Sequence, residues 1–313
     1  MAWILALWCL ALLFVGGLVT TYRVGMAVPD WPTTFGRNMF TYPLDEMLSN
    51  FGVTVEHSHR LVASGLGLIS ILTVVLVFAM RERAGLRKLS VGVLAAIVAQ
   101  GLLGGSRVLE NDQRLAFLHG ASAQLVYGLV AAFFVLTTRA WSTLETRPCK
   151  QARGLRRLAV LTLVLVYCQI VLGAWLRHSG ATIALALHVF GAVASFFLVL
   201  ALAKKLFATF DEGAAGGHER GPLRSTARWL VSCLLGQMAL GLLSVFAIYG
   251  VSGGFAARPS MFEVVSATSH VAVGALLLGG CVAAVLFSRR TVRVTAVAKQ
   301  PAAAVQPGLG LTA

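Results

Sequence analysis

The sequence predicts an all-α integral membrane protein in which eight transmembrane helices form two pseudo-repeated four-helix bundles. Hydrophobic residues make up 58% of the 313 residues and charged residues 12%, whereas a soluble domain carries roughly a quarter charged residues. The apolar residues come in long blocks, and a helix needs about 20 of them to cross the hydrocarbon core of a bilayer. The short alternating segments of about ten residues that indicate a transmembrane barrel are not found.

Eight apolar blocks meet this length and are separated by short charged stretches. In chain order they are Trp3–Thr20, Thr54–Met80, Leu89–Ser106, Leu115–Thr138, Leu158–Trp175, Ala181–Ala203, Trp229–Val251 and Val264–Phe287. The first block begins without a basic segment and runs on past Arg23 without a cleavage site, so we expect a retained helix instead of a signal peptide.

The formal net charge of +14 is compatible with nucleic-acid binding, but its distribution indicates membrane topology. The stretches after the second, fourth, sixth and eighth blocks hold the excess of Lys and Arg, and the other loops are balanced in charge. By the positive-inside rule, both termini lie in the cytoplasm. No Arg- and Ser-rich presequence precedes the first block, so we expect a multi-pass protein of a bacterial plasma membrane with no nucleic-acid partner.

A loose internal repeat divides the chain. The motif Gln-x-x-Leu-Gly occurs at Gln100–Gly104, Gln169–Gly173 and Gln237–Gly241, at a similar depth in the third, fifth and seventh blocks, while the first block has only Gly16 and Gly17. Small residues are common where membrane helices pack closely, which explains the glycines but not the recurring glutamine.

We therefore expect an N-terminal half at residues 1–142 and a C-terminal half at residues 155–290. Each half holds four helices, so a parallel repeat relates the two. Residues 291–313, rich in Ala, Val, Gln and Pro, predict a disordered cytoplasmic tail.

One histidine lies near the outer end of each even-numbered block, namely His59, His119, His188 and His270. An ionisable side chain inside a membrane is costly and usually marks a functional site. Two imidazoles from facing helices of a bundle can hold a haem iron from both sides, whereas a zinc or di-metal site needs further ligands. The sequence therefore favours two paired-histidine haem sites over four isolated core histidines.

The residues one turn after these histidines are all small, namely Ala63, Ala123, Ala192 and Gly274. Positions i and i+4 share a helix face, so small side chains there would leave room for a macrocycle. Small residues are also abundant in membrane helices, which explains the pattern without a cofactor.

Glu56 distinguishes the two halves. It lies three residues before His59 and four before Arg60, so the three side chains can share a helix face, while the second half has Leu185 and Ala267 three residues before its histidines. If both halves bind haem, only the first places an acid beside the ring, where it could act on a haem substrate. A plain ion pair between Glu56 and Arg60 at the helix terminus is the alternative.

Three arginines lie at outer helix ends, where they are suited to contacts with haem propionates. They are Arg60, Arg107 and Arg177. Anchoring at the membrane interface accounts for each of them equally well.

Together these features resemble the haem A synthase family. The resemblance rests on Glu56-His-Ser-His59-Arg60, on Leu118-His119-Gly120, on Gly25-Met-Ala-Val-Pro-Asp-Trp-Pro-Thr33, on the Gln-x-x-Leu-Gly motifs and on the histidine in each even block. It covers most of the chain. Residues 21–53 lack the cysteine pair that some members carry in the first outer loop, so no role of a loop disulfide applies here.

The resemblance implies an enzyme that oxidises the C8 methyl group of haem O to a formyl group, giving haem A for cytochrome oxidase. It implies that His59 and His119 hold the iron of haem O, the substrate, and that Glu56 is the catalytic residue at the methyl group. His188 and His270 would ligate haem b, a cofactor that relays electrons. The implied partners are the synthase that supplies haem O, the cytochrome oxidase assembly machinery and an electron donor, and a homo-oligomer stays open.

Two other functions stay open on the residues alone. A non-catalytic dihaem protein that passes electrons within the bilayer would use the same histidines but would not need Glu56 in one half only. A transporter with histidines as proton relays would require broken helices at mid-membrane, and the even blocks contain no proline.

Overall fold

The computed structural model describes residues 1–143, 147–149, 151–211, 221–255 and 258–294. The long helices of this part of the chain are α1 (Ala2–Tyr22), α3 (Phe51–Ala79), α4 (Ala84–Glu110), α5 (Gln113–Thr137), α7 (Ala152–Ser179), α8 (Thr182–Asp211), α9 (Pro222–Val245) and α10 (Met261–Thr291). All eight are long and apolar enough to cross a membrane, α9 together with the π-helical turn Phe246–Val251 that continues it. The predicted all-α integral membrane protein with eight spanning helices is confirmed.

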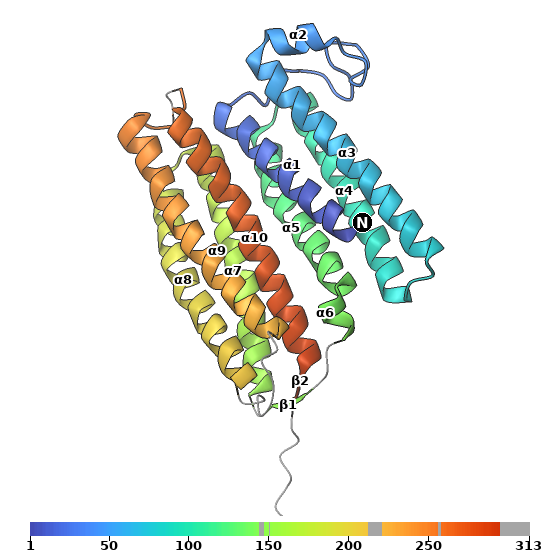
Figure 1. Ribbon diagram of the computed structural model, residues 1–313. Coiled ribbons are helices and arrows are strands. Elements are labelled where there is room, and N and C mark those ends of the chain that lie inside the picture. Colours follow the sequence, from blue (N-terminus) through green and yellow to red (C-terminus); the bar gives the residue numbers. More distant parts are fainter. Residues whose placement is uncertain (144–146, 150, 212–220, 256–257, 295–313) are drawn as a thin grey trace, which may run out of the picture.

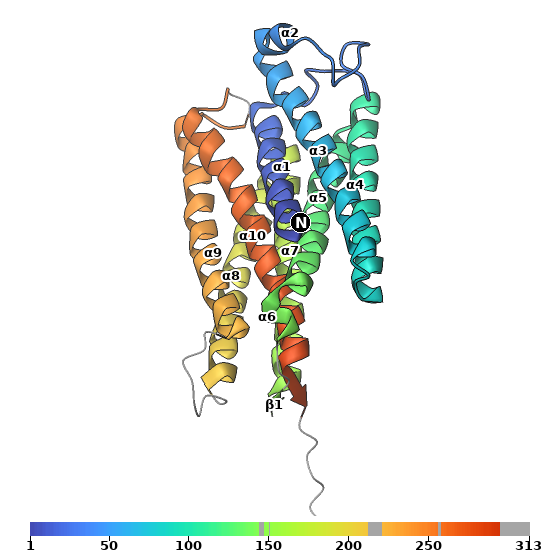
Figure 2. The same ribbon diagram turned by 45° about the vertical axis from the view of Figure 1, so that its right-hand side comes forward.

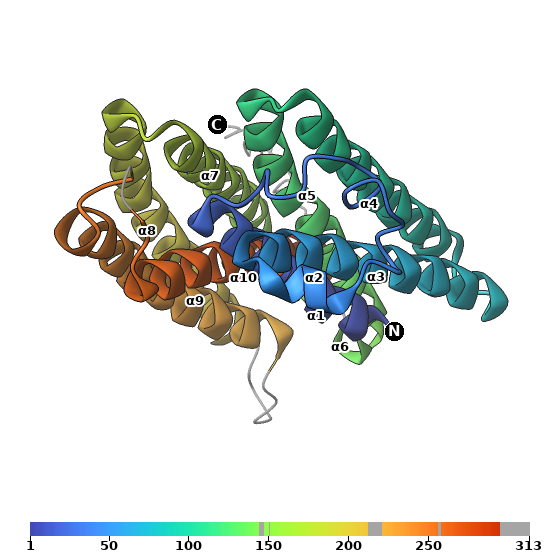
Figure 3. The same ribbon diagram turned by 90° about the horizontal axis from the view of Figure 1, so that it is seen from above.

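The helices form two four-helix bundles with the same order of neighbours. In the N-terminal half, α1 and α4 each pack against α3 and α5; in the C-terminal half, α7 and α9 each pack against α8 and α10. Figure 1 shows the first bundle in blue to green beside the second in yellow-green to red, and the view from above in Figure 3 shows the two side by side. In each bundle the two helices that carry the predicted histidines therefore face each other across a diagonal.

Polar caps fix where two of the histidine-bearing helices begin. Asn50 accepts hydrogen bonds from the backbone amides of Gly52 and Val53 at the start of α3, at 2.9 and 3.3 Å. Asp112 accepts one from the amide of Arg114 at the start of α5. Such caps satisfy amides that have no partner within the helix. The start of α3 directly follows the short helix α2 (Leu44–Ser49). Figure 2 shows α2 at one end of the molecule and β1 at the other.

The loop between α1 and α3 folds onto this α2 end. Trp31 lies against Gly105 of α4 so closely that a Cβ atom at position 105 would collide with the indole ring. Only glycine permits this approach of a helix backbone to the ring. The loop is thereby held against the last turns of α4.

The end of the molecule opposite α2 contains a contact that the sequence did not predict. Strand β2 (Val292–Val294) pairs in parallel with β1 (Arg147–Cys149), just after the short helix α6 (Arg139–Ser142). The sequence predicted disorder from residue 291 onward, whereas Thr291 ends α10 and the backbone of residues 292–294 pairs with the linker between the halves. Residues 295–313 lie outside the described residues.

The two halves meet where α1 crosses α10. The hydroxyls of Thr21 and Thr268 are 3.2 Å apart, and Thr21 also donates to the carbonyl of Gly17 at 2.8 Å. A Cβ atom at Gly17 would lie 3.0 Å from the Thr268 methyl carbon. Close helix contact through small and hydroxyl residues is the usual way in which membrane helices associate.

Gly17→Leu is expected to lower the free energy of unfolding by about 1–3 kcal/mol, because the added side chain must push α1 away from α10. Gly101→Leu is the matched control, since position 101 is exposed and a Cβ atom there meets nothing within 4 Å. Unfolding in mixed detergent micelles measures both. Equal stability of the two variants would contradict a tight crossing at Gly17.

Candidate functional site

The four predicted histidines lie at equivalent places in the two bundles. His59 on α3 faces the diagonal helix α5 that carries His119, and the two imidazoles are within electrostatic range of each other. His188 on α8 and His270 on α10 lie with ring centroids 6.2 Å apart and planes at 74°. All four belong to the first turns of helices that begin at the α2 end.

The spacing of the second pair fits a metal ion between two imidazoles. Metal–imidazole nitrogen bonds of about 2.0–2.1 Å would place the two nitrogens about 4 Å and the ring centroids about 6 Å apart. His188 and His270 have this separation. A haem iron held from both sides is therefore compatible with the second bundle.

A glycine of the preceding helix lies under each histidine ring. A Cβ atom at the glycine would lie 2.8–3.1 Å from the imidazole Cε1 atom. The pairs are Gly16 with His59, Gly104 with His119, Gly173 with His188 and Gly241 with His270. Since Cβ atoms rarely approach other atoms so closely, a side chain at these glycines would crowd the ring and require it to shift.

The glutamine of the repeated motif contacts a histidine of the following helix. Gln100 Nε2 is 3.1 Å from His119 Nδ1, and Gln169 Nε2 is 3.0 Å from His188 Nδ1. Both amides also donate to the backbone carbonyl of the same histidine, at 2.6 and 2.5 Å. The motif thus supplies one polar contact and, four residues later, the glycine on which the ring lies.

The third glutamine, Gln237, contacts its histidine through different atoms: its side-chain amide lies at Nε2 and its backbone carbonyl at Nδ1. His270 Nδ1 lies 3.2 Å from the backbone carbonyl of Gln237, and the amide nitrogen of Gln237 lies 3.1 Å from His270 Nε2. Donation from Nδ1 to a carbonyl leaves Nε2 as the nitrogen that can bind a metal. The Gln237 amide would have to turn aside for Nε2 to do so.

One of the four small residues that follow the histidines, Gly274, has a glutamine of the neighbouring helix beside it. A Cβ atom at Gly274 would lie 3.2 Å from the amide nitrogen of Gln237, and one at Gly191 would collide with the amide oxygen of Gln169. The room beside Gly274, which we expected to receive a macrocycle, is therefore occupied by the glutamine of the neighbouring helix.

His59 is the exception among the four. Its Nδ1 atom is buried and has no hydrogen-bond partner among the described residues. The residue four positions before Gly16 is Leu12, where the other three helices have glutamine. The departure of the first block from the repeat thus coincides with an unpartnered imidazole nitrogen.

Glu56 and Arg60 form a buried ion pair. Arg60 Nη2 donates to Glu56 Oε1 at 2.9 Å, and the two residues are 8% and 3% exposed. Glu56 Oε2 accepts a hydrogen bond from the backbone amide of Val28 at 3.0 Å. The ion pair that the sequence left as an alternative therefore exists, inside the protein instead of on its surface.

Arg60 also ties the outer loop to α3. Its guanidinium donates to the carbonyls of Val28, Asp30 and Thr33, at 2.7, 2.6 and 3.0 Å. These bonds and the one to Glu56 engage both terminal nitrogens. The expected contact of Arg60 with a propionate is replaced here by contacts with the protein's own loop.

Arg107 lies close to the first histidine pair. It donates to the carbonyl of Gly25 and is within electrostatic range of Glu56, His59 and His119. Of the three predicted arginines, Arg107 is the one that the fold brings to both histidines of the first bundle.

Arg177 on α7 lies close to one histidine of the second pair. It donates to the Thr21 hydroxyl and is within electrostatic range of His270 and Glu263. The sequence reasoning missed Glu263, which is 3% exposed and has one carboxylate oxygen without a partner among the described residues. It lies seven residues, or two helical turns, before His270, and this spacing could have placed it on the same helix face. The second half thus also has a buried acid, although it lies farther from its histidine along the helix than Glu56 does.

The remaining histidines differ from the four. His57 is buried with Nδ1 3.0 Å from the Thr34 hydroxyl in the outer loop. His178 lies at the end of α7 beside Gly120. His218 lies outside the described residues. None of the three was predicted to hold iron.

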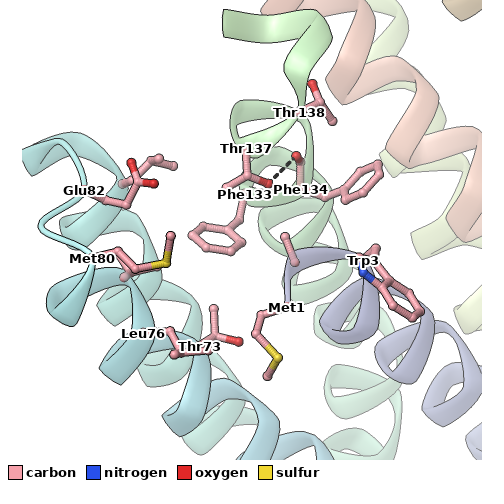
Figure 4. Close-up of a pocket in the computed structure, with 13 residues that line it drawn as sticks. Met1, Trp3, Thr73, Leu76, Met80, Glu82, Phe133, Phe134, Thr137 and Thr138 are labelled. Atoms are coloured by element: carbon pink, nitrogen blue, oxygen red, sulfur yellow. Dashed lines mark hydrogen bonds between the residues drawn. The ribbon is translucent and has the colours of Figure 1, made fainter.

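A surface pocket at the other end of the N-terminal bundle does not involve these residues. Figure 4 shows Met1 and Trp3 at the start of α1, Thr73 and Met80 near the end of α3, and Phe133 near the end of α5 around it. The lining is mostly apolar and lies near the cytoplasmic ends predicted from charge. It is separate from the histidine sites.

Comparison with known proteins gives a family. The sequence model of the cytochrome oxidase assembly protein family COX15-CtaA matches residues 1–187. These residues include Glu56, His59 and His119 and end one residue before His188.

Three curated relatives are each named heme A synthase. The protein of Alkalihalophilus pseudofirmus is 31% identical over 56% of this chain and 58% of its own length. The protein of Symbiobacterium thermophilum is 30% identical over 62% and 70%, and that of Shouchella clausii is 30% identical over 58% and 59%. The chain thus covers less than two thirds of the length of two of these relatives.

Asp30 organises the loop that carries the carbonyl partners of Arg60. It accepts hydrogen bonds from the amides of Phe35 and Gly36, both at 2.8 Å, and from the Thr33 hydroxyl at 2.5 Å. Desolvation alone would raise the pKa of the Asp30 carboxyl, but these hydrogen bonds outweigh it and hold the pKa below its usual range. The carboxylate therefore contributes stability above its unfolded-state pKa of about 3.9, and this contribution is lost as the pH falls through the lower folded-state pKa.

Amide exchange at Phe35 and Gly36, corrected for the intrinsic pH dependence, is expected to accelerate below about pH 4 in the wild type. In Asp30→Asn it should be fast already at neutral pH and change little with acid. Asp45→Asn, an exposed acid of the same segment, is the control and should behave as the wild type. Acid acceleration that persists in Asp30→Asn would rule out Asp30 as the titrating group.

Proposed function

This chain belongs to the COX15-CtaA family of cytochrome oxidase assembly proteins, and we propose that it is a haem A synthase. In this proposal it is a membrane oxidoreductase that oxidises the C8 methyl group of haem O, the substrate, to a formyl group. The product, haem A, supplies cytochrome oxidase. The observation that carries the proposal is the occurrence of two facing histidine pairs, with a buried acid three residues before one of them.

His59 and His119 would hold the iron of haem O in the first bundle. Gly16 and Gly104 leave room for these imidazoles, since a Cβ atom at either position would lie 3.1 or 2.8 Å from the ring. Arg107, which lies within electrostatic range of both histidines, is the candidate for a propionate contact at this site. Arg60 is engaged by the loop and is not assigned this role.

His188 and His270 would hold haem b in the second bundle, and Arg177 would lie near its propionates. Haem b, when bound, supplies one-electron transfer between an external donor and the substrate site. The protein's contribution is the fixed separation of the two imidazoles, with centroids 6.2 Å apart.

Glu56 would act at the methyl group of the substrate. Conversion of the methyl to the formyl group removes four electrons, as in two hydroxylations of the carbon followed by loss of water. Arg60 and the amide of Val28 hold the carboxylate in one position. From there it would accept a proton or stabilise positive charge at the reacting carbon.

The proposed setting is a bacterial plasma membrane with both termini in the cytoplasm. An even number of spanning helices places the two termini on the same side, and the excess of Lys and Arg in the linker after α5 and in the tail favours the cytoplasm. The partners would be the enzyme that supplies haem O and the cytochrome oxidase assembly machinery.

The haem content of the purified protein tests the ligand assignments. The chain is produced beside a source of haem O, and extracted haems are identified by pyridine haemochrome spectra and mass. His188→Ala and His270→Ala should each remove haem b, while His59→Ala and His119→Ala should each reduce retained haem O or haem A. His218→Ala is the control. Two haem b groups per chain and no haem O or haem A would instead support an electron-transfer protein.

Glu56→Gln should leave both haems bound but stop the conversion of haem O to haem A, since the amide keeps the shape and loses the charge. Glu263→Gln is the matched variant of the other buried acid, in the C-terminal half, and should still form haem A. The ratio of haem A to haem O in extracts measures both. If Glu263→Gln lost haem A formation and Glu56→Gln kept it, the reaction would belong to Glu263, and the role proposed for Glu56 would be wrong.

A further inference from the structure

Three of the four histidines have a partner for Nδ1, and the fourth does not. Nδ1 contacts the Gln100 amide in His119, the Gln169 amide in His188 and the Gln237 carbonyl in His270. The Nδ1 atom of His59 is buried without any such contact among the described residues.

The contrast is sharpest within the first bundle. The Gln100 amide that contacts His119 is itself fixed, because its oxygen accepts from the Ser122 hydroxyl at 2.8 Å and its nitrogen donates to the His119 carbonyl at 2.6 Å. The helix behind His59 offers glycine at position 16 and an apolar side chain at position 12. One ring of the pair is therefore held by a hydrogen-bond network and the other only by packing.

Hydrogen bonds to the second nitrogen of a ligating histidine fix its tautomer and orientation and raise its basicity. Loss of such a partner typically lowers metal affinity by about 10–100-fold. In the arrangement seen here the Gln100 and Gln169 amide nitrogens donate to Nδ1 and to the histidine carbonyl. A half-turn of the amide would give up the bond to the carbonyl and present the amide oxygen to Nδ1–H, which is the tautomer in which Nε2 binds the metal. His59 has no group in the described structure that could do so.

We propose that His59 is the weak, exchangeable ligand of the first pair, so that haem enters and leaves the N-terminal bundle by making and breaking the bond to His59. His119 stays as the fixed ligand, and the second pair keeps its haem. This inference rests on the proposed function, since it requires that the histidine pairs hold haem. It gives a physical reason why one site exchanges substrate and product while the other retains a cofactor.

Leu12→Gln tests the inference by supplying the missing amide at the position that the repeat assigns to it. Release of haem O and haem A to an excess of apomyoglobin should slow by about 10–100-fold, while release of haem b stays unchanged. Leu13→Gln is the matched control, because it adds the same side chain to the neighbouring, also partly buried position, and should leave the rate as in the wild type. Gln100→Leu should accelerate release from the same site.

If haem O and haem A were released at equal rates from Leu12→Gln, Leu13→Gln and the wild type, the inference would be wrong, but the proposed function would still stand. Absence of any haem O or haem A from the wild-type protein would instead overturn the proposed function itself.

The wild-type protein provides a measurement that does not depend on a variant. After reduction, carbon monoxide should displace His59 and shift the spectrum of haem O or haem A, and leave that of haem b unchanged. Carbon monoxide binding to haem b alone, or to neither haem, would overturn the inference.

Discussion

The arrangement of the whole protein depends on four close contacts between a glycine backbone and an imidazole ring. Each bundle brings two helices to opposite corners of a square, and the histidines of these helices can meet at the axis only if the intervening helix lacks a side chain there. Gly16, Gly104, Gly173 and Gly241 meet this requirement, since a Cβ atom at each would lie only 2.8–3.1 Å from the Cε1 atom of its histidine. This requirement explains why a glycine recurs at the end of each Gln-x-x-Leu-Gly motif.

The second determinant is the buried pair Glu56 and Arg60. A charged pair inside a protein is tolerated when its remaining hydrogen-bonding groups are satisfied, and here the carbonyls and one amide of the loop at residues 28–33 satisfy them. The same bonds fold the loop over the N-terminal bundle. The charge that serves the proposed chemistry thus also builds the cover of the site.

The two halves share a framework and differ in its polar details. Both have a facing histidine pair and an arginine with a buried acid within its electrostatic range. Only the first half lacks one of the glutamine contacts. Under the proposals above, this one difference would give two haem sites of unequal ligand strength on nearly the same framework.

The sequence by itself determined the eight spanning helices, the two halves and the four histidines. These predictions rest on local features of the sequence, namely the length of the apolar blocks, the distribution of charge and the spacing of the motifs. Only the tertiary structure decided that Gln237 fills the room beside Gly274, that Arg60 binds the loop, that Glu263 is buried near Arg177 and that residues 292–294 pair with the linker. These contacts join residues that are far apart in the chain. Helical periodicity predicts on which face of its helix a residue lies, but it does not predict which other helix or loop packs against that face.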